Sequence, residues 1–172
     1  MPGIEIGTAI FHRTRGVGRV VAREMRSWAG RETHYLVVEM MADDYTIRIP
    51  ETSPDIRPVL DDTAVIFETL HNKANVLPGH YRTRQAEIRD AVSSGIPKKI
   101  AAAARDLWAY SESKQGSWTT GGERLYNQAL EMLAAEIAAS QNCNIDEAKN
   151  RVRQAMSRGV DPADEALHDD EA

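Results

Sequence analysis

The hydrophobic pattern of the chain changes close to residue 60. From Ile4 to Pro50, apolar and polar residues alternate in short runs rich in Val, Ile, Thr and Tyr, which is typical of β-strands. Glycine and aspartate, both favoured in turns, separate these runs. The predicted strands cover residues 8–11, 18–24, 33–40 and 45–49, with a hairpin connection at 29–32. Several short antiparallel strands over about fifty residues favour a small, strongly bent barrel over a sandwich.

Beyond residue 60, apolar residues recur every three or four positions, as they do in amphipathic helices. A short helix capped by Asp61 or Asp62 reaches Leu70, and residues 71–79 read as a linker broken by Pro78 and Gly79. Further helices are predicted at residues 81–92, 98–110, from 120 onward and through 156.

Local signals place the ends of these helices. Pro97 suits a first helical turn, Thr120 and Glu123 have the spacing of a capping box, and Asn144 repeats the capping pattern before the last helix. The predicted core face of the longest helix comprises Leu125, Ala129, Met132, Leu133, Glu136 and Ile137.

Together these patterns predict an α+β protein of two domains. A small antiparallel β-barrel precedes an all-α bundle of four to five helices. The predicted boundaries are 1–55 for the β domain, 56–79 for a short helix and linker, 80–158 for the helical domain and 159–172 for an acidic, disordered tail.

Charge is distributed unevenly along the chain. The net charge is −5, but residues 160–172 hold six acids and no Lys or Arg, so residues 1–159 carry +1. The first 31 residues and residues 78–110 are both locally basic. These two regions indicate an anionic partner, although solvated and locally paired arginines would give the same pattern.

The residues that catalysis requires do not cluster in the sequence. The glycines of Gly16-Val17-Gly18 precede a strand rather than a helix, so they suit a tight turn instead of a phosphate site. The five histidines are scattered, and Cys143 is the only cysteine. We therefore expect no enzymatic activity, no cofactor and no metal site. No signal peptide or membrane span is evident, so a cytoplasmic protein is expected.

Several segments, in order, resemble the CarD/CdnL family of bacterial RNA polymerase-binding transcription regulators. The N-terminal module of that family is shared with transcription-repair coupling factors. The resemblance runs from about Ile4 to Met156 and rests on the order and spacing of its pieces. These pieces are residues 16–21, 24–26, 34–39, 45–50, 93–95, 104–108 and 119–125.

The resemblance implies that the β domain is a Tudor-like barrel that docks on the β subunit of RNA polymerase. The docking arginines of the family match Arg26 and Arg48, and Thr46 and Pro50 belong to the same matching region. In the strand pattern, Thr46 and Arg48 share the polar face, which agrees with an outward-facing contact. Without the resemblance, both arginines would be read as solvated sheet residues.

The resemblance also implies that the helical domain contacts promoter DNA upstream of the −10 element. The family inserts a tryptophan into the minor groove at the edge of the melted bubble, and Tyr81 stands at that position here. A tyrosine that packs on the bundle is the alternative for this position. Trp108 fits a core pattern, and Trp118 precedes a capped helix. The DNA-binding candidates are Tyr81, Arg82, Arg84, Arg89, Lys98, Lys99 and Arg124.

The expected function is therefore a monomeric, non-enzymatic transcription regulator that modulates the stability of the promoter open complex. The alternative is a polymerase-bound protein–protein adaptor with little direct DNA contact, which the net acidic charge favours. The acidic tail is expected to shield the basic helical surface, so that a chain ending at Gly159 binds DNA more tightly.

Overall fold

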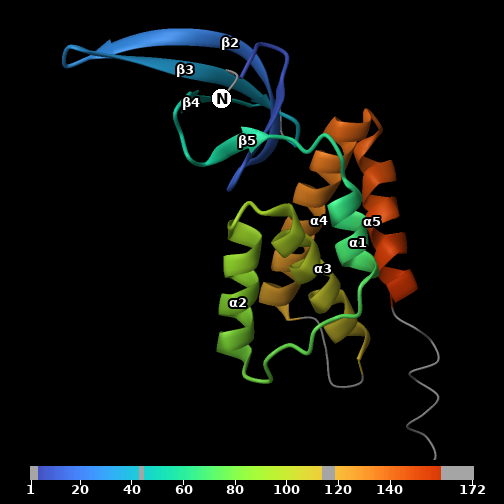
Figure 1. Cartoon of the computed structure of the whole chain (residues 1–172). Coiled ribbons are helices and arrows are strands. Elements are labelled where there is room, and N and C mark those ends of the chain that lie inside the picture. The colour runs from blue at the N-terminus through green and yellow to red at the C-terminus, as the bar shows by residue number, and fades with distance from the viewer. Residues whose placement is uncertain (1–3, 43–44, 114–118, 160–172) are drawn as a thin grey trace, which may run out of the picture.

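The computed structural model describes residues 4–42, 45–113 and 119–159, which form a five-stranded sheet followed by five helices (Figure 1). The strands are β1 (Ala9–His12), β2 (Gly16–Trp28), β3 (Arg31–Met40), β4 (Thr46–Pro50) and β5 (Ile56–Pro58). The helices are α1 (Ala64–His71), α2 (Tyr81–Ser93), α3 (Pro97–Glu112), α4 (Thr120–Gln141) and α5 (Ile145–Gly159). The predicted α+β architecture, sheet first and helices second, is confirmed.

The sheet is antiparallel, with strand order β4-β3-β2-β1-β5, and the predicted closure into a barrel is wrong. β4 and β5 lie at opposite edges, and no pairing joins them among the described residues. β5 lies within the predicted linker and is only three residues long, too short to show alternation. It ends at Pro58, which has no N–H donor, and the next residue, Val59, donates its N–H to the Ala9 carbonyl at 3.3 Å.

The hairpin of β2 and β3 is longer than its sequence pattern predicts. It projects from the rest of the sheet (Figure 1) and turns at Ala29 and Gly30 instead of over four residues. Both residues have positive φ angles, 50° and 76°, as tight two-residue hairpin turns require. Alternation of apolar and polar residues marks only the part of a hairpin that has one buried face. The distal residues face water on both sides, so their sequence shows no such alternation.

The helical core begins earlier in the chain than predicted, because α1 is part of the bundle. Ile66 and Leu70 of α1 are fully buried in the same cluster as the core face of α4. All six residues predicted for that core face are buried, including Glu136.

The predicted helix ends are confirmed at two positions and wrong at two. Pro97 opens α3, and the Asn144 side chain accepts the Asp146 N–H. The predicted cap at Asp61 or Asp62 lies too early, because Thr63 is the N-cap of α1, although the Asp62 carboxylate accepts the Ala64 N–H. The predicted cap at Thr120 lies one residue too late, because Thr119 Oγ1 accepts the Gly122 N–H at 3.1 Å. Two consecutive threonines offer the same local signal, and only the backbone path distinguishes them.

The sheet stands on one end of the bundle (Figure 1). Phe11 of β1 and Val17 of β2 belong to the helical core, whereas Ile10 and Val20 belong to a separate core within the sheet. Adjacent residues of β1 therefore point to different cores, which is the expected result of strand alternation. The two modules share an apolar interface.

Some predictions fall outside the described residues. These are the acidic tail beyond Gly159 and the position of Trp118. Among the helices of the described ranges, none has the length and apolar character needed to cross a membrane.

Candidate functional site

The four residues predicted to contact polymerase lie on one face of the sheet. Thr46, Arg48 and Pro50 alternate along β4, and they pair with Glu39, Val37 and Tyr35 of β3. On its other side β3 pairs with β2, where Tyr35 lies opposite Glu24 and Thr33 lies opposite Arg26. Side chains of directly paired residues point to the same side of a sheet. We call the surface formed by Glu24, Arg26, Thr46, Arg48 and Pro50 the arginine face.

Glu24 joins the two arginines of this face. Its carboxylate accepts Arg48 Nε at 3.0 Å and Arg26 Nη2 at 3.1 Å, and the Arg26 guanidinium also lies 5.9 Å from the Tyr35 ring centroid. The hydrogen bond from Arg48, together with that from Arg26, lowers the pKa of the Glu24 carboxyl. The Arg26 and Arg48 side chains remain about half exposed, at 56% and 46%. The face thus presents two guanidinium groups held by one carboxylate.

The residues predicted to contact DNA lie along the bundle instead of at one point. α2 begins at the end of the bundle farthest from the sheet, and α3 begins at the end nearest to it (Figure 1). Tyr81 and Arg82 therefore lie far from Lys98 and Lys99, and Arg89 lies between the two ends on α2. All five side chains are exposed, as is that of Arg124 near the start of α4. A helix of thirteen residues is about 20 Å long, which is the rise of about six base pairs.

Arg84 differs from the other basic candidates because its guanidinium is engaged within the protein. Nη1 donates to the carbonyls of Pro78 and Gly79, at 2.8 and 3.1 Å, and the guanidinium lies 4.4 Å from the Tyr110 ring centroid. Arg84 is only 8% exposed. These contacts fasten the start of α2 to the end of α3, so Arg84 positions Tyr81 instead of offering a free charge.

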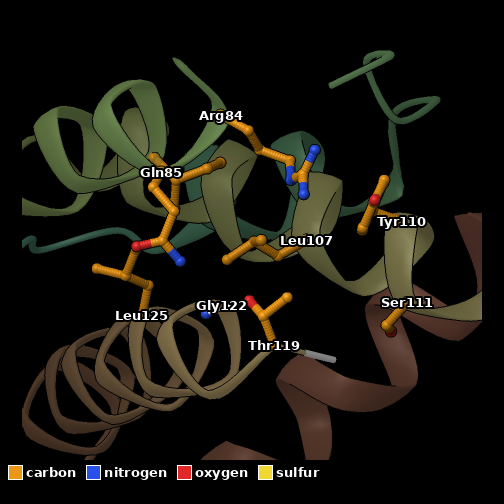
Figure 2. A pocket seen from close by; sticks show the side chains of 9 residues that line it. Arg84, Gln85, Leu107, Tyr110, Ser111, Thr119, Gly122 and Leu125 are labelled. Carbon is orange, nitrogen blue, oxygen red and sulfur yellow. Dashed lines mark hydrogen bonds between the residues drawn. The ribbon is translucent and has the colours of Figure 1, made fainter. Parts of the chain in front are cut away.

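A hollow lies next to this arginine, between α2, α3 and the first turn of α4. Figure 2 shows Arg84 and Tyr110 on one side and Gln85 extending toward α4. Gly121 allows this approach, because a Cβ at that position would lie 2.4 Å from Gln85 Nε2. Gly121 thereby lets α2 pack closely against the start of α4.

A polar cluster at the junction of sheet and bundle was not predicted from the sequence. Arg57 of β5 forms a two-pronged ion pair with Glu136 of α4, with N–O distances of 2.5 and 2.9 Å. The same guanidinium donates to the Gly95 carbonyl and lies 4.3 Å from the Phe11 ring centroid. The only sequence signal was the position of Glu136 on an apolar helix face.

A second buried cluster holds the segment before α2. Asp106 accepts the backbone N–H and the side-chain amide of Asn75, at 2.9 and 3.0 Å. Arg105 pairs with Asp106 at 2.7 Å and also donates to the Thr69 carbonyl. The predicted linker is therefore tied to α3, and the position of Tyr81 depends on this attachment.

The core assignment of Trp108 is confirmed. Its ring packs against the helical core and lies 6.0 Å from the Tyr126 ring, centroid to centroid. Within the described ranges, His, Cys, Asp and Glu side chains form no group of three suited to a metal ion.

Comparisons with known proteins identify the helical half of the chain. The family model described as "CarD, C-terminal domain" matches residues 65–153, slightly more than half of the sequence. A Bacillus subtilis (strain 168) protein named "Putative transcription factor YdeB" is 26% identical over 142 residues. That alignment covers 77% of this chain and 89% of the Bacillus protein.

Proposed function

The chain belongs to the CarD family, and on that premise we propose that it is a transcription regulator that contacts RNA polymerase and promoter DNA at the same time. The similarity to a protein named as a transcription factor supports this assignment. The observation that carries the proposal is the arginine face, where the residues that match the docking positions of the family share one exposed surface.

The arginine face is proposed to dock on the β subunit of RNA polymerase. Arginine is a frequent anchor of protein interfaces, since its planar group forms several hydrogen bonds at once. Glu24 holds Arg26 and Arg48 at a fixed spacing before any partner arrives, which lowers the entropy lost on binding. Acidic groups on the partner would complement this surface.

The far end of α2 is proposed to contact promoter DNA upstream of the −10 element. Tyr81 is 46% exposed at the first position of the helix, and Arg82 is exposed beside it. An aromatic ring inserted into the minor groove stabilises a distorted duplex, and nearby arginines hold its phosphates. Arg89 lies seven residues from Arg82, on the same stripe of α2, and extends the basic surface toward the sheet.

The proposed mechanism is preferential binding to the open complex. A regulator that binds the open complex more tightly than the closed one shifts their equilibrium by that difference in free energy. A coupling of about 1–3 kcal/mol changes the ratio of open to closed complexes about 5–150-fold. No catalytic group is needed for this effect.

The first test is the lifetime of the open complex on one promoter with the cognate polymerase. We expect the wild-type protein to lengthen the lifetime, and Arg48→Glu to abolish the effect by reversing a docking charge. Tyr81→Ala is expected to shorten the lifetime at least tenfold relative to wild type when the variant is saturating. Tyr81→Phe, which keeps the ring, is expected to retain most of the effect.

Arg158→Glu is the matched control for Arg48→Glu. Arg158 is an exposed arginine in the last turn of α5, on the bundle and outside the arginine face, so its reversal should leave the lifetime unchanged. Loss of the effect with both charge reversals would indicate a nonspecific dependence on charge and contradict the docking proposal. A wild-type protein that binds no polymerase would contradict the whole function.

A second candidate function is a polymerase-bound adaptor with little DNA contact. The exposed surface of α2 favours it, because Glu87 and Asp90 accompany Arg82 and Arg89 and cancel their charge. Salt dependence of duplex binding separates the two functions, since each phosphate contact steepens the decline of affinity with salt. An adaptor would show weak binding at low salt and almost no slope.

A further inference from the structure

The junction of sheet and bundle is held by a single buried carboxylate. Glu136 is 1% exposed, and both of its oxygens are engaged. Oε1 accepts Arg57 Nη1 and the Leu60 N–H, at 2.5 and 3.1 Å, and Oε2 accepts Arg57 Nη2 at 2.9 Å. Because Arg57 also donates to the Gly95 carbonyl, three separate segments meet at this pair, namely residues 57–60, the α2–α3 loop and α4.

These contacts restrict orientation more than the apolar interface around them does. Apolar packing is non-directional, so Phe11 and Val17 could stay buried while the sheet tilts on the bundle. A two-pronged arginine–carboxylate pair requires coplanar groups at short distances, and therefore defines an angle. The Phe11 ring, 4.3 Å from the guanidinium, connects the apolar and polar parts of the junction.

We propose that the Arg57–Glu136 pair is a positioning latch, which sets the orientation of the arginine face relative to α2. Its purpose rests on the proposed function, since a protein that contacts polymerase and DNA together needs a fixed geometry between the two surfaces. Linked sites gain about 10²–10⁴-fold in joint affinity when their geometry matches, and lose this gain when it does not. The latch is thus distinct from either contact surface.

Three variants test the latch. Glu136→Gln keeps the size of the side chain but removes its charge. The double variant Arg57→Met with Glu136→Leu replaces the pair by apolar groups, a change that is often neutral or stabilising for buried ion pairs. Leu133→Ala, one turn away on α4, lowers stability with the pair intact and serves as the control for lost stability.

We expect the latch variants to bind polymerase and DNA separately as wild type does, but to lose most of the effect on the open-complex lifetime. Glu136→Gln and the double variant should bind polymerase within about twofold of wild type and bind duplex DNA equally well, because neither surface is altered. Both should shorten the open-complex lifetime about tenfold, by loss of the matched geometry. Leu133→Ala should keep the wild-type lifetime at temperatures where it is folded. A double variant that restores the lifetime would overturn the latch, because the pair would then act through stability alone.

A distance measurement tests the latch independently of transcription. Spin labels at Ser27→Cys and Ser157→Cys, in a Cys143→Ala background, report the separation of hairpin and bundle through two exposed sites. We expect a narrow distribution of distances in the otherwise unchanged protein and a broad one in both latch variants. Equally narrow distributions would overturn the proposal. If the wild-type protein fails to lengthen the open-complex lifetime, the proposed function is wrong, and the distances still decide whether the pair sets the orientation.

Discussion

Two arginine–glutamate clusters in this protein use the same groups in opposite environments. On the arginine face, Glu24 is shared by Arg26 and Arg48, whose side chains are about half exposed. At the junction, Glu136 is almost completely buried and pairs with Arg57, whose side chain is 28% exposed. The first cluster can exchange its partners with those of another molecule, whereas the carboxylate of the second is closed to solvent and to partners.

The difference between the clusters shows that burial decides what an ion pair does. Exposed pairs are screened by water and contribute little to stability, so their arginines remain available for binding. A buried carboxylate has lost its hydration, and removal of its partner leaves an uncompensated charge. The exposed cluster is therefore suited to recognition, and the buried one to fixing the geometry of the fold.

The largest expected effect comes from breaking the buried cluster. Glu136→Ala should lower the free energy of unfolding by about 3–5 kcal/mol, because Arg57 and the Leu60 N–H lose their partner inside the junction. Urea denaturation followed by circular dichroism measures the loss. Glu24→Ala is the matched change in the exposed cluster, and it should lower the denaturation midpoint only slightly. Equal losses of unfolding free energy in the two variants would contradict the conclusion that burial decides what each ion pair does.

A smaller effect is expected at Gly95, the backbone partner of Arg57. Gly95 has a φ of +71°, and a Cβ there would lie 3.1 Å from Arg13 Cγ. Gly95→Ala should cost about 1–2 kcal/mol of stability through the left-handed backbone. Gly79→Ala, at a position with open space and no positive φ, should be neutral or slightly stabilising in the same thermal unfolding assay. A neutral Gly95→Ala would show that the junction adapts to strain.

The smallest effect concerns the pH dependence of the exposed cluster. The pKa of Glu24 is lowered from its ordinary value of 4.5 in the folded protein, so the unfolded state binds more protons over this range. The stabilisation is fully present above pH 4.5 and disappears as pH falls through the lower folded pKa. Urea midpoints of wild type and Glu24→Gln should therefore differ slightly at neutral pH and converge in acid. A gap that widens in acid would contradict the assigned partners.

Part of the candidate site was predictable because it depends on strand alternation. Thr46 and Arg48 are two residues apart and therefore share a face. The placement of Arg26 beside them could not be derived in this way, because the β2–β3 register shifts between Val20 and Ala22. A bulge of this kind moves every later side chain by one position relative to the partner strand.

Two charged residues lie on apolar helix faces, and the sequence pattern contained a signal for this. Arg84 is spaced four and eight residues from the buried Ile88 and Val92, so it lies on the apolar face of α2. Glu136 lies on the core face of α4, next to Leu133 and Ile137. A charge at the spacing of a core face indicates a buried partner rather than a free surface group.

The sequence by itself determined the order and type of the elements except β5, several helix ends and the core face of α4. These features depend on hydrogen bonds and hydrophobic periods within a few residues, which are visible in the local pattern. Only the tertiary structure decided that the sheet stays open, that Arg84 is engaged and that Arg57 meets Glu136. That pair joins residues 79 positions apart, and no local preference specifies which of many distant charges will be brought together.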